Sequence, residues 1–268
     1  MSSDSSSENL QACRLCHSIV YQFLNSSFDE TLSQMDVDKN DTIPSYYTPE
    51  LHKETQTMVR NTLKIYEDVL NDYSMEELSI SYNGGKDCLV MLVIYLAAIY
   101  EKTREGSLIN SVYINNEEAF EEQDKFLDNT VKYYGLDFIP IRSEMKEGFE
   151  RYLEMKSQIK AIIVGIRRID PYGEKLNISQ RTDNGWPDFV RIHPVLEWKT
   201  SEVWYFLKAT RTEYCELYDK GYTSLGGRNS TIQNPLLKQK DGKYLAAYML
   251  DDDRNERLSR VKRREEKL

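Results

Sequence analysis

The sequence predicts an α/β protein built around a doubly wound, mostly parallel sheet with flanking helices. From residue 77 onward, short apolar segments typical of strands alternate with longer segments whose apolar residues recur at helical spacing. Such alternation is typical of parallel sheets with right-handed crossovers. The segment 161–166 is apolar throughout, as expected of a strand buried on both faces. The segment 78–100 reads as a buried strand, a Gly-Gly turn and an apolar helix.

Two helices are expected before this alternating region. Apolar spacing predicts the first over residues 10–28, and Pro49 opens the second, which runs to about Asp72. Proline is favoured at a first helical position. We expect the Ser-rich, acidic residues 1–9 to be disordered and residues 33–48 to form a linker. The two helices are interpreted as an appendage packed on the main sheet.

The predicted elements of the alternating region follow in order. Strands are expected over 78–82, 111–115, 138–141 and 161–166, and helices over 88–100, 117–134 and 145–156. Gly135 is a suitable residue to end the second of these helices. A strand over 190–195 and a helix over 200–210, with Thr200 as its N-cap, complete the pattern. Together these elements describe a Rossmann-like sheet.

Composition restricts the partners. The formal net charge of −9, from 35 basic and 44 acidic residues, argues against a general nucleic-acid-binding protein. The polar start carries no signal-peptide pattern, and the apolar run 89–100 is well short of the ~20 residues that a membrane span needs. We therefore expect a cytoplasmic protein without membrane or nucleic-acid partners. Nothing in the sequence indicates an obligate dimer, and we expect a monomer.

The turn Ser81-Tyr82-Asn83-Gly84-Gly85-Lys86-Asp87-Cys88 is the first candidate site. Paired glycines allow a sharp turn and close approach of a ligand, and the following helix presents free N–H groups and a positive dipole end. Phosphate is the usual anion at such a turn, and Lys86 would add a mobile charge. The spacing fits neither a Walker loop nor the dinucleotide fingerprint. A plain β–turn–α crossover is the alternative, although it would need no such charges.

Further candidate loops follow the predicted strands, because ligands of such sheets bind at the carboxyl ends of strands. The loop 165–171 carries Arg167 and Arg168, which are costly at the end of a buried strand unless they meet anions; an ordinary exposed loop is the alternative. In the loop 180–189, Trp186 could stack on a planar ring and Asp188 could bind a metal or a ring N–H. A proline-braced turn with a buried Trp is the alternative there.

Four blocks in order resemble the eukaryotic-type FAD synthetases, or FMN adenylyltransferases, which are related in fold to PAPS reductase and to other adenine-nucleotide α-hydrolase-like enzymes. The blocks are 81–88, 165–171, 180–189 and 218–226, and Arg254 and Arg257 follow in the tail. The resemblance spans about residues 80–257 and is to the yeast-like, single-domain form. Two departures from the usual Ser-Gly-Gly-x-Asp-Ser turn are Cys88 in place of serine and Asn83 before the glycines.

The resemblance implies transfer of AMP from ATP to the 5′-phosphate of FMN, giving FAD and pyrophosphate, with Mg²⁺. It implies one PAPS reductase-like domain, in which helices 1–75 precede a nucleotide-binding core, 76–200, and residues 201–268 complete the substrate site. The Mg²⁺ ligands would be Asn83 and Asp188. The implied catalytic residues are Asn83, Lys86, Asp87, Asp188, Arg254 and Arg257. The implied nucleotide- and flavin-binding residues are Ser81, Tyr82, Gly84, Gly85, Ile114, Gly165, Ile166, Arg167, Arg168, Asp170, Asp183 and Trp186. How Asp170, Asp183 and Asp188 divide these roles is left open.

The chemistry agrees with the residue types. The FMN phosphate is already a nucleophile at neutral pH, so the reaction needs neither a covalent intermediate nor a strong general base. The chain has only three histidines, and no motif pairs a nucleophile with a base. The reaction instead needs placement of two polyanions in line and neutralisation of the charge that develops on phosphate.

Three alternative functions are less compatible with the sequence. A PAPS or APS reductase needs a reactive cysteine near the C-terminus, whereas the last cysteine here is Cys215. A tRNA-modifying enzyme would favour a basic surface and paired cysteines near the site, whereas Cys13-x-x-Cys16 lies in a predicted helix and is interpreted as a pair of buried thiols. A non-catalytic nucleotide- or flavin-carrying module would not need a second set of charged loops. Dependence on Mg²⁺ together with pyrophosphate release distinguishes these alternatives from the main hypothesis.

Overall fold

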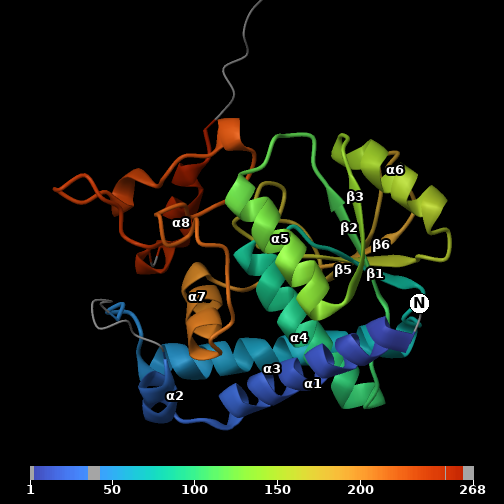
Figure 1. Ribbon diagram of the computed structural model, residues 1–268, viewed down its shortest axis with the longest axis horizontal. Helices are drawn as coiled ribbons and strands as arrows, with labels where there is room; N and C mark the ends of the chain where they lie inside the picture. Colours follow the sequence, from blue (N-terminus) through green and yellow to red (C-terminus); the bar gives the residue numbers. More distant parts are fainter. Residues whose placement is uncertain (1–2, 36–42, 251, 262–268) are drawn as a thin grey trace, which may run out of the picture.

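The computed structural model describes residues 3–35, 43–250 and 252–261 and confirms the α/β class (Figure 1). Six strands form one sheet in the order β3-β2-β1-β4-β6-β5. Neighbouring strands are parallel, except that β5 is antiparallel to β6. The strands are β1 Leu78–Ser81, β2 Ile109–Ile114, β3 Leu136–Ile141, β4 Ala161–Val164, β5 Ser179–Arg181 and β6 Val190–Ile192.

Helices cover both faces of the sheet, as a doubly wound fold requires. Alternate residues of β4 separate two hydrophobic clusters, since Ile163 packs into the larger one and Ile162 into the smaller. The larger cluster includes residues of α4 Lys86–Thr103, α5 Glu121–Tyr134 and α7 Thr200–Ala209, and the smaller one is covered by α6 Met145–Met155. Helix α4 is buried from Leu89 to Ala97 on all sides, which explains why its apolar residues show no single face.

Three N-terminal helices precede the sheet; the first and third pack on α4, on the side away from α6, and the second contacts α7 (Figure 1). They are α1 Ser3–Asn25, α2 Phe28–Gln34 and α3 Pro49–Asp72. The bounds predicted for α3 are confirmed, with Thr48 as N-cap accepting the Leu51 N–H at 3.2 Å. The disorder predicted for residues 1–9 is wrong from Ser3 onward, because α1 continues to that residue. Asn9 ties this helix to the core through hydrogen bonds to Tyr134 O and from Ser107 N, both at 2.9 Å.

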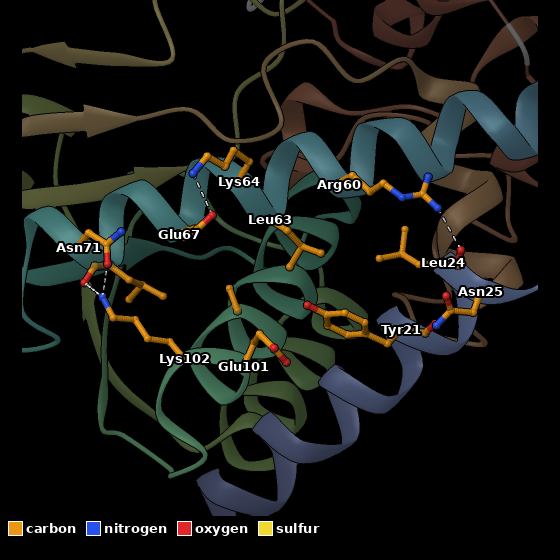
Figure 2. A pocket seen from close by; sticks show the side chains of 12 residues that line it. Tyr21, Leu24, Asn25, Arg60, Leu63, Lys64, Glu67, Asn71, Glu101 and Lys102 are labelled. Carbon is orange, nitrogen blue, oxygen red and sulfur yellow. Dashed lines mark hydrogen bonds and ion pairs between the residues drawn. The ribbon is translucent and has the colours of Figure 1, made fainter.

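A cavity of about 660 Å³ lies where α1 and α3 diverge above α4 (Figure 2). Arg60 donates to Leu24 O at 3.1 Å, and so satisfies a carbonyl at the end of α1. Lys102 does the same at the end of α3, where it also donates to Asn71 Oδ1 at 2.8 Å. Arg60 and Lys102 therefore brace helix ends, whereas Lys64, which also lines the cavity, pairs with Glu67 within α3.

Other differences from the sequence-based expectation are local. Strand β5 was expected to be part of a loop, since its three residues are polar. Helix α7 has Lys199 rather than Thr200 as its N-cap, and Glu202 accepts the Lys199 N–H at 2.7 Å. The middle of the predicted linker (36–42) and the charged end (262–268) lie outside the described residues. Among the described residues, no helix combines the length and apolar character that crossing a membrane requires.

The part of the chain that the structure describes after α7, residues 210–250 and 252–261, lies beside α5 and α7 (Figure 1). It contains one short α-helix, α8 Asp253–Glu256, and four 3₁₀ turns: η1 Arg228–Ser230, η2 Pro235–Leu237, η3 Ala247–Met249 and η4 Arg257–Ser259. This segment brings the tail of the chain, including α8 and η4, to the carboxyl ends of β1 and β4, as the contacts below demonstrate.

Candidate active site

The site lies at the topological switch point of the sheet. Strands β1 and β4 are neighbours, while β2 and β3 continue the sheet on one side and β6 and β5 on the other. Ligands of doubly wound sheets bind in the crevice outside such a point. The Gly-Gly turn follows β1 and the loop 165–171 follows β4, so the two predicted loops meet at this crevice.

The Gly-Gly turn has the conformation that its residues predict. Gly84 has φ +71°, in the left-handed region that favours glycine, and Gly85 is the N-cap of α4. Asn83 Oδ1 accepts the Gly85 N–H at 2.9 Å and so helps to shape the turn. A Cβ at Gly165 would lie only 2.7 Å from Cys88 Sγ. Glycine at this position therefore allows the loop after β4 to pack against the first turn of α4.

Lys86 is not the mobile charge that the sequence suggested. Its side chain is only 2% exposed, with Nζ 2.7 Å from Glu256 Oε1 and 2.9 Å from Asp87 Oδ2. Its backbone N–H donates to Tyr218 OH at 3.0 Å. Lys86 is the first residue of α4, and its side chain turns into the protein to reach two carboxylates. The correction follows from the tail of the chain, which covers the turn and supplies Glu256.

Arg167, at the start of the loop after β4, is fully buried. Its Nε lies 2.8 Å from Asp87 Oδ1, and its Nη2 pairs with Glu256. Its Nη1 donates to Thr200 Oγ1 at 3.0 Å and lies 3.4 Å from Asp253 Oδ1. Arg167 and Lys86 thus share the carboxylates of Asp87 and Glu256, and these four side chains form a buried charge network.

The pKa of Glu256, inside the network, and the pKa of Asp170, beside it, shift in opposite directions. Burial alone would raise the pKa of Glu256, but the Lys86 ammonium and the Arg167 guanidinium lower it to about 2. Burial, and next the Asp87 carboxylate, raise the pKa of Asp170. Asp170 accepts the Arg167 N–H at 2.9 Å and lies 3.2 Å from Nη1 of Arg257. The site therefore holds two buried cations, each paired with carboxylates, and an acid whose ionised form is poorly compensated.

A second group of charges lies at the carboxyl end of β2. Glu117 accepts the Gly227 N–H at 2.8 Å and the Ser230 hydroxyl at 2.7 Å. A Cβ at Gly226 would collide with the Arg260 guanidinium, whose Nη1 donates to Leu225 O at 3.0 Å. Burial, and next the charge of Arg257, lower the pKa of Arg260. In the pair Gly226-Gly227, the Gly227 N–H therefore binds the Glu117 carboxylate, and the missing side chain of Gly226 leaves room for the Arg260 guanidinium.

Several predicted residues point elsewhere. The Tyr82 side chain is buried in the core and donates to Thr130 Oγ1 at 3.1 Å. Arg168 braces its own loop through Leu176 O at 2.7 Å and Glu197 at 2.9 Å. Arg254 is 85% exposed and pairs with Asp252 at 2.8 Å. Ser81 and Ile114 end β1 and β2 beside the crevice, and Gly165 and Ile166 follow β4.

The loop 182–189 joins the sheet at its other edge, because Val190 pairs with Ala161, the first residue of β4. Asp188 lies directly before this strand, is 66% exposed, and is bound by Arg181, with Nε to Oδ1 at 2.6 Å. Asp183 and Trp186 lie further along the loop, which folds back along α6; the Trp186 ring centroid is 6.3 Å from that of Phe149. The structure therefore does not bring these three residues into the buried network.

Sequence patterns did not identify the tail residues that pair with Arg167. Glu256 and Asp253 lie in the segment 251–257, in which the family resemblance pointed only to Arg254 and Arg257. Thr200 was interpreted only as a cap. A glutamate between two arginines, in a segment that mixes acidic and basic residues, is a signal for ion pairs. Which of these acids is buried depends on the path of the tail, which local patterns do not encode.

Comparison with known proteins agrees with this geometry. The family model "Phosphoadenosine phosphosulfate reductase domain" matches residues 77–158 and 145–233, a region that includes the Gly-Gly turn and the loop after β4. The chain therefore has the PAPS reductase-like domain that its fold indicated. Within that class, the chain belongs to the FAD synthase family, since it is 41% identical over 210 residues to the "Probable FAD synthase" of Schizosaccharomyces pombe. That match covers 76% of this chain and 79% of the relative.

Other relatives give the same result. The "Flavin adenine dinucleotide synthase" of Saccharomyces cerevisiae is 35% identical over 184 residues, which cover 61% of this chain and 60% of that protein. Candida glabrata FMN adenylyltransferase in complex with FMN and the ATP analogue AMPCPP superposes with a TM-score of 0.82 at 27% identity, over 94% of this chain and 99% of that one. Yeast FAD synthetase in complex with FAD has a TM-score of 0.80 at 28% identity, over the same shares of the two chains. The predicted family resemblance and the predicted fold are thus confirmed.

Proposed function

We propose that this chain is an FMN adenylyltransferase, which transfers AMP from ATP to the 5′-phosphate of FMN and releases pyrophosphate. The observation that carries the proposal is a Gly-Gly turn at the switch point of the sheet, backed by two buried cations, in a member of the FAD synthase family. Catalysis requires a place where two polyanions can meet in line. The crevice between the turn after β1 and the loop after β4 offers that place.

ATP phosphates are proposed to bind at the Gly-Gly turn. The start of α4 presents the positive end of its dipole to the crevice, although the Gly85 and Lys86 N–H groups already donate to Asn83 and Tyr218. Gly84 and Gly85 would let the phosphates approach the backbone, and Lys86 and Arg167 lie beneath the turn, held by Asp87 and Glu256. In a site of low dielectric such fixed charges stabilise charge that develops on phosphate. Ile114, at the end of β2, is proposed to border the adenine.

Tail cations are proposed to complete phosphate binding. Arg257 reaches the crevice, since it lies beside Asp170, and Arg260 is half-buried next to Gly226. We propose this pair in place of Arg254 and Arg257, because Arg254 faces solvent and is bound by Asp252. The two guanidinium groups are three residues apart and would each be able to bind phosphate oxygens in a forked geometry.

Mg²⁺ is the metal that the family implies, and the donor set is compatible with it. Among the residues that the structure describes, no three His, Cys, Asp or Glu side chains are grouped to hold an ion. Mg²⁺ is commonly held by one or two carboxylates together with substrate phosphates, and Asp87 and Asp170 offer carboxylates at the turn. The amide oxygen of Asn83 lies in the same turn. Bound there, Mg²⁺ would neutralise charge on the phosphates. Because Asp188 lies at the opposite edge of the sheet, is 66% exposed and pairs with Arg181, we propose that Asp188 braces its loop.

The flavin ring is proposed to bind toward α6. The N-terminal end of α6 follows β3, so this end of the helix lies at the carboxyl edge of the sheet. The loop 182–189 approaches the helix there. A Cβ at Gly185 would lie 3.7 Å from Lys146 Nζ, in the first turn of α6. Trp186 is 39% exposed and has a ring suited to stacking. Asp183, three residues earlier, is proposed to bind a polar edge of the ring.

The reductase alternative is disfavoured by the cysteines. Cys215 is buried, and burial raises its pKa to about 11, which leaves little thiolate at neutral pH. All four cysteines of the chain are free and buried, as is typical of a protein from a reducing compartment. We propose that the chain acts in the cytoplasm as a single-domain monomer, since the network closes within one chain.

The test is an assay of the purified chain with ATP, FMN and Mg²⁺, in which FAD is separated by chromatography and pyrophosphate is measured in parallel. Equal amounts of both products are expected. Omission of FMN should stop pyrophosphate release. Pyrophosphate formed at the same rate without FMN would point to another acceptor.

A further inference from the structure

We infer that Glu256 is a positioning residue of the adenylyl-transfer site, which holds Lys86 and Arg167 in the orientation that the reaction uses. The inference rests on the proposed function. Glu256 lies on α8, 170 residues from Lys86 in sequence. No motif of the Gly-Gly turn contains it, yet it joins the two cations that lie behind the turn.

Both carboxylate oxygens of Glu256 have cationic partners. Oε1 lies 2.7 Å from Lys86 Nζ, while Oε2 pairs with Arg167 Nη2 and accepts the Thr200 hydroxyl. The side chain is 3% exposed, so water does not screen these contacts. Two buried cations that approach one another are tolerated only when a shared anion lies between them. Glu256 supplies that anion together with Asp87.

The backbone that carries Glu256 is itself fixed. The Thr223 hydroxyl donates to Glu256 O at 2.6 Å, and Asn234 donates to Asn255 O at 2.9 Å. Ser259 Oγ accepts the Thr223 N–H at 3.0 Å. These buried side chains hold α8 and η4 from both ends, so the carboxylate is presented in one place. The next residue, Arg257, is thereby directed toward Asp170.

Fixing the two cations has a consequence for the reaction. A lysine has a flexible stem and three rotatable donors, so its ammonium takes one position only when its partners hold it there. Glu256 and Asp87 do so for Lys86, and the same two acids hold Arg167. Charges that are fixed before the substrate arrives need no reorganisation during the reaction, and a displacement of about 1 Å typically costs on the order of 100-fold in rate.

The test is the variant Glu256→Gln, which keeps the shape of the side chain and removes its charge. FAD formation is measured against ATP and FMN concentration at a temperature at which circular dichroism shows the variant to be folded. We expect kcat/KM for ATP to fall about 100-fold, mainly through kcat. The matched control is Glu67→Gln, which removes an exposed ion pair with Lys64 on α3 and should retain wild-type kinetics.

Wild-type kcat and KM in the folded Glu256→Gln variant would overturn the inference, because Glu256 would then contribute to stability alone. Tighter ATP binding at unchanged kcat would also overturn it, since Glu256 would then compete with phosphate for Lys86. If the glutamine variant does not fold, the test uses Glu256→Asp, which keeps the charge but shortens the side chain by one methylene. Reduced kcat in that variant supports the inference, and wild-type kcat contradicts it. Failure of the wild-type chain to form FAD would refute the proposed function instead.

Discussion

Replacement of Lys86 by methionine is expected to destabilise the protein strongly, in addition to impairing catalysis. Methionine has a similar length but no charge, so Glu256 and Asp87 lose a buried partner at 2.7 and 2.9 Å. Removing one partner of a buried ion pair typically costs about 3–5 kcal/mol. For a protein of this size, each 1 kcal/mol lowers the Tm by about 2–4 °C, so a decrease of roughly 6–20 °C is expected.

The pH dependence of this defect follows from Glu256. Its pKa is about 2 in the folded protein, below its ordinary value of about 4.3 in an unfolded chain. A lowered pKa contributes stability above the unfolded value, and that contribution is lost as the pH falls from about 4.3 toward 2. The Tm difference between wild type and Lys86→Met should therefore be largest near pH 7 and shrink below about pH 4.

Scanning calorimetry or thermal circular dichroism at about pH 7 and about pH 3 measures both effects. The matched control is Lys64→Met, which removes an exposed lysine from α3 and should change the Tm little. A Tm for Lys86→Met within about 2 °C of wild type at pH 7 would refute the reasoning. A difference that small is expected when an exposed ion pair, which contributes about 0–1 kcal/mol of stability, is lost. Lys86 would then be the mobile phosphate ligand that the sequence suggested.

Three other predictions concern residues outside the network. Asp188→Ala removes an exposed ion pair, so the free energy of unfolding should change by less than about 1 kcal/mol with FAD formation largely retained; a loss of kcat that extra Mg²⁺ restores would reinstate Asp188 as a metal ligand. Arg257→Ala should impair kcat/KM about tenfold or more beyond Arg254→Ala, since only Arg257 reaches the crevice; equal losses in steady-state assays would contradict that placement. Burial raises the pKa of Cys88 to about 12, so iodoacetamide at pH 8 should leave the native enzyme active; rapid inactivation traced to Cys88 by mass spectrometry would show that the thiol is accessible.

Much of the fold could be predicted from the sequence, because local patterns and the sheet agree. Pro49 and the spacing of apolar residues set α3, and the apolar segments 78–82 and 161–166 mark the strands at the centre of the sheet. Strand β5 could not be predicted in this way. Its residues Ser179, Gln180 and Arg181 are polar and form a strand only because β6 offers them an edge.

The site was predictable in part, for a similar reason. The Gly-Gly turn and Arg167 are recognisable because glycine geometry and buried charge are local properties. Glu256 reaches Lys86 and Arg167 only through the path of the residues after α7, and a charged tail is typical of a solvated surface. The role of Lys86 changed with it, since the sequence places the lysine at the turn but does not reveal which carboxylates reach it.

The most direct measurement of the central claim is product formation by the purified wild-type chain with FMN, ATP and Mg²⁺. We predict that FAD and pyrophosphate appear in equal amounts and that neither forms when ATP is replaced by its α,β-methylene analogue AMPCPP, in which the bond to be cleaved is blocked. Pyrophosphate without FAD would retain cleavage between the α and β phosphates but contradict FMN as the acceptor. The absence of both products would contradict the proposed reaction.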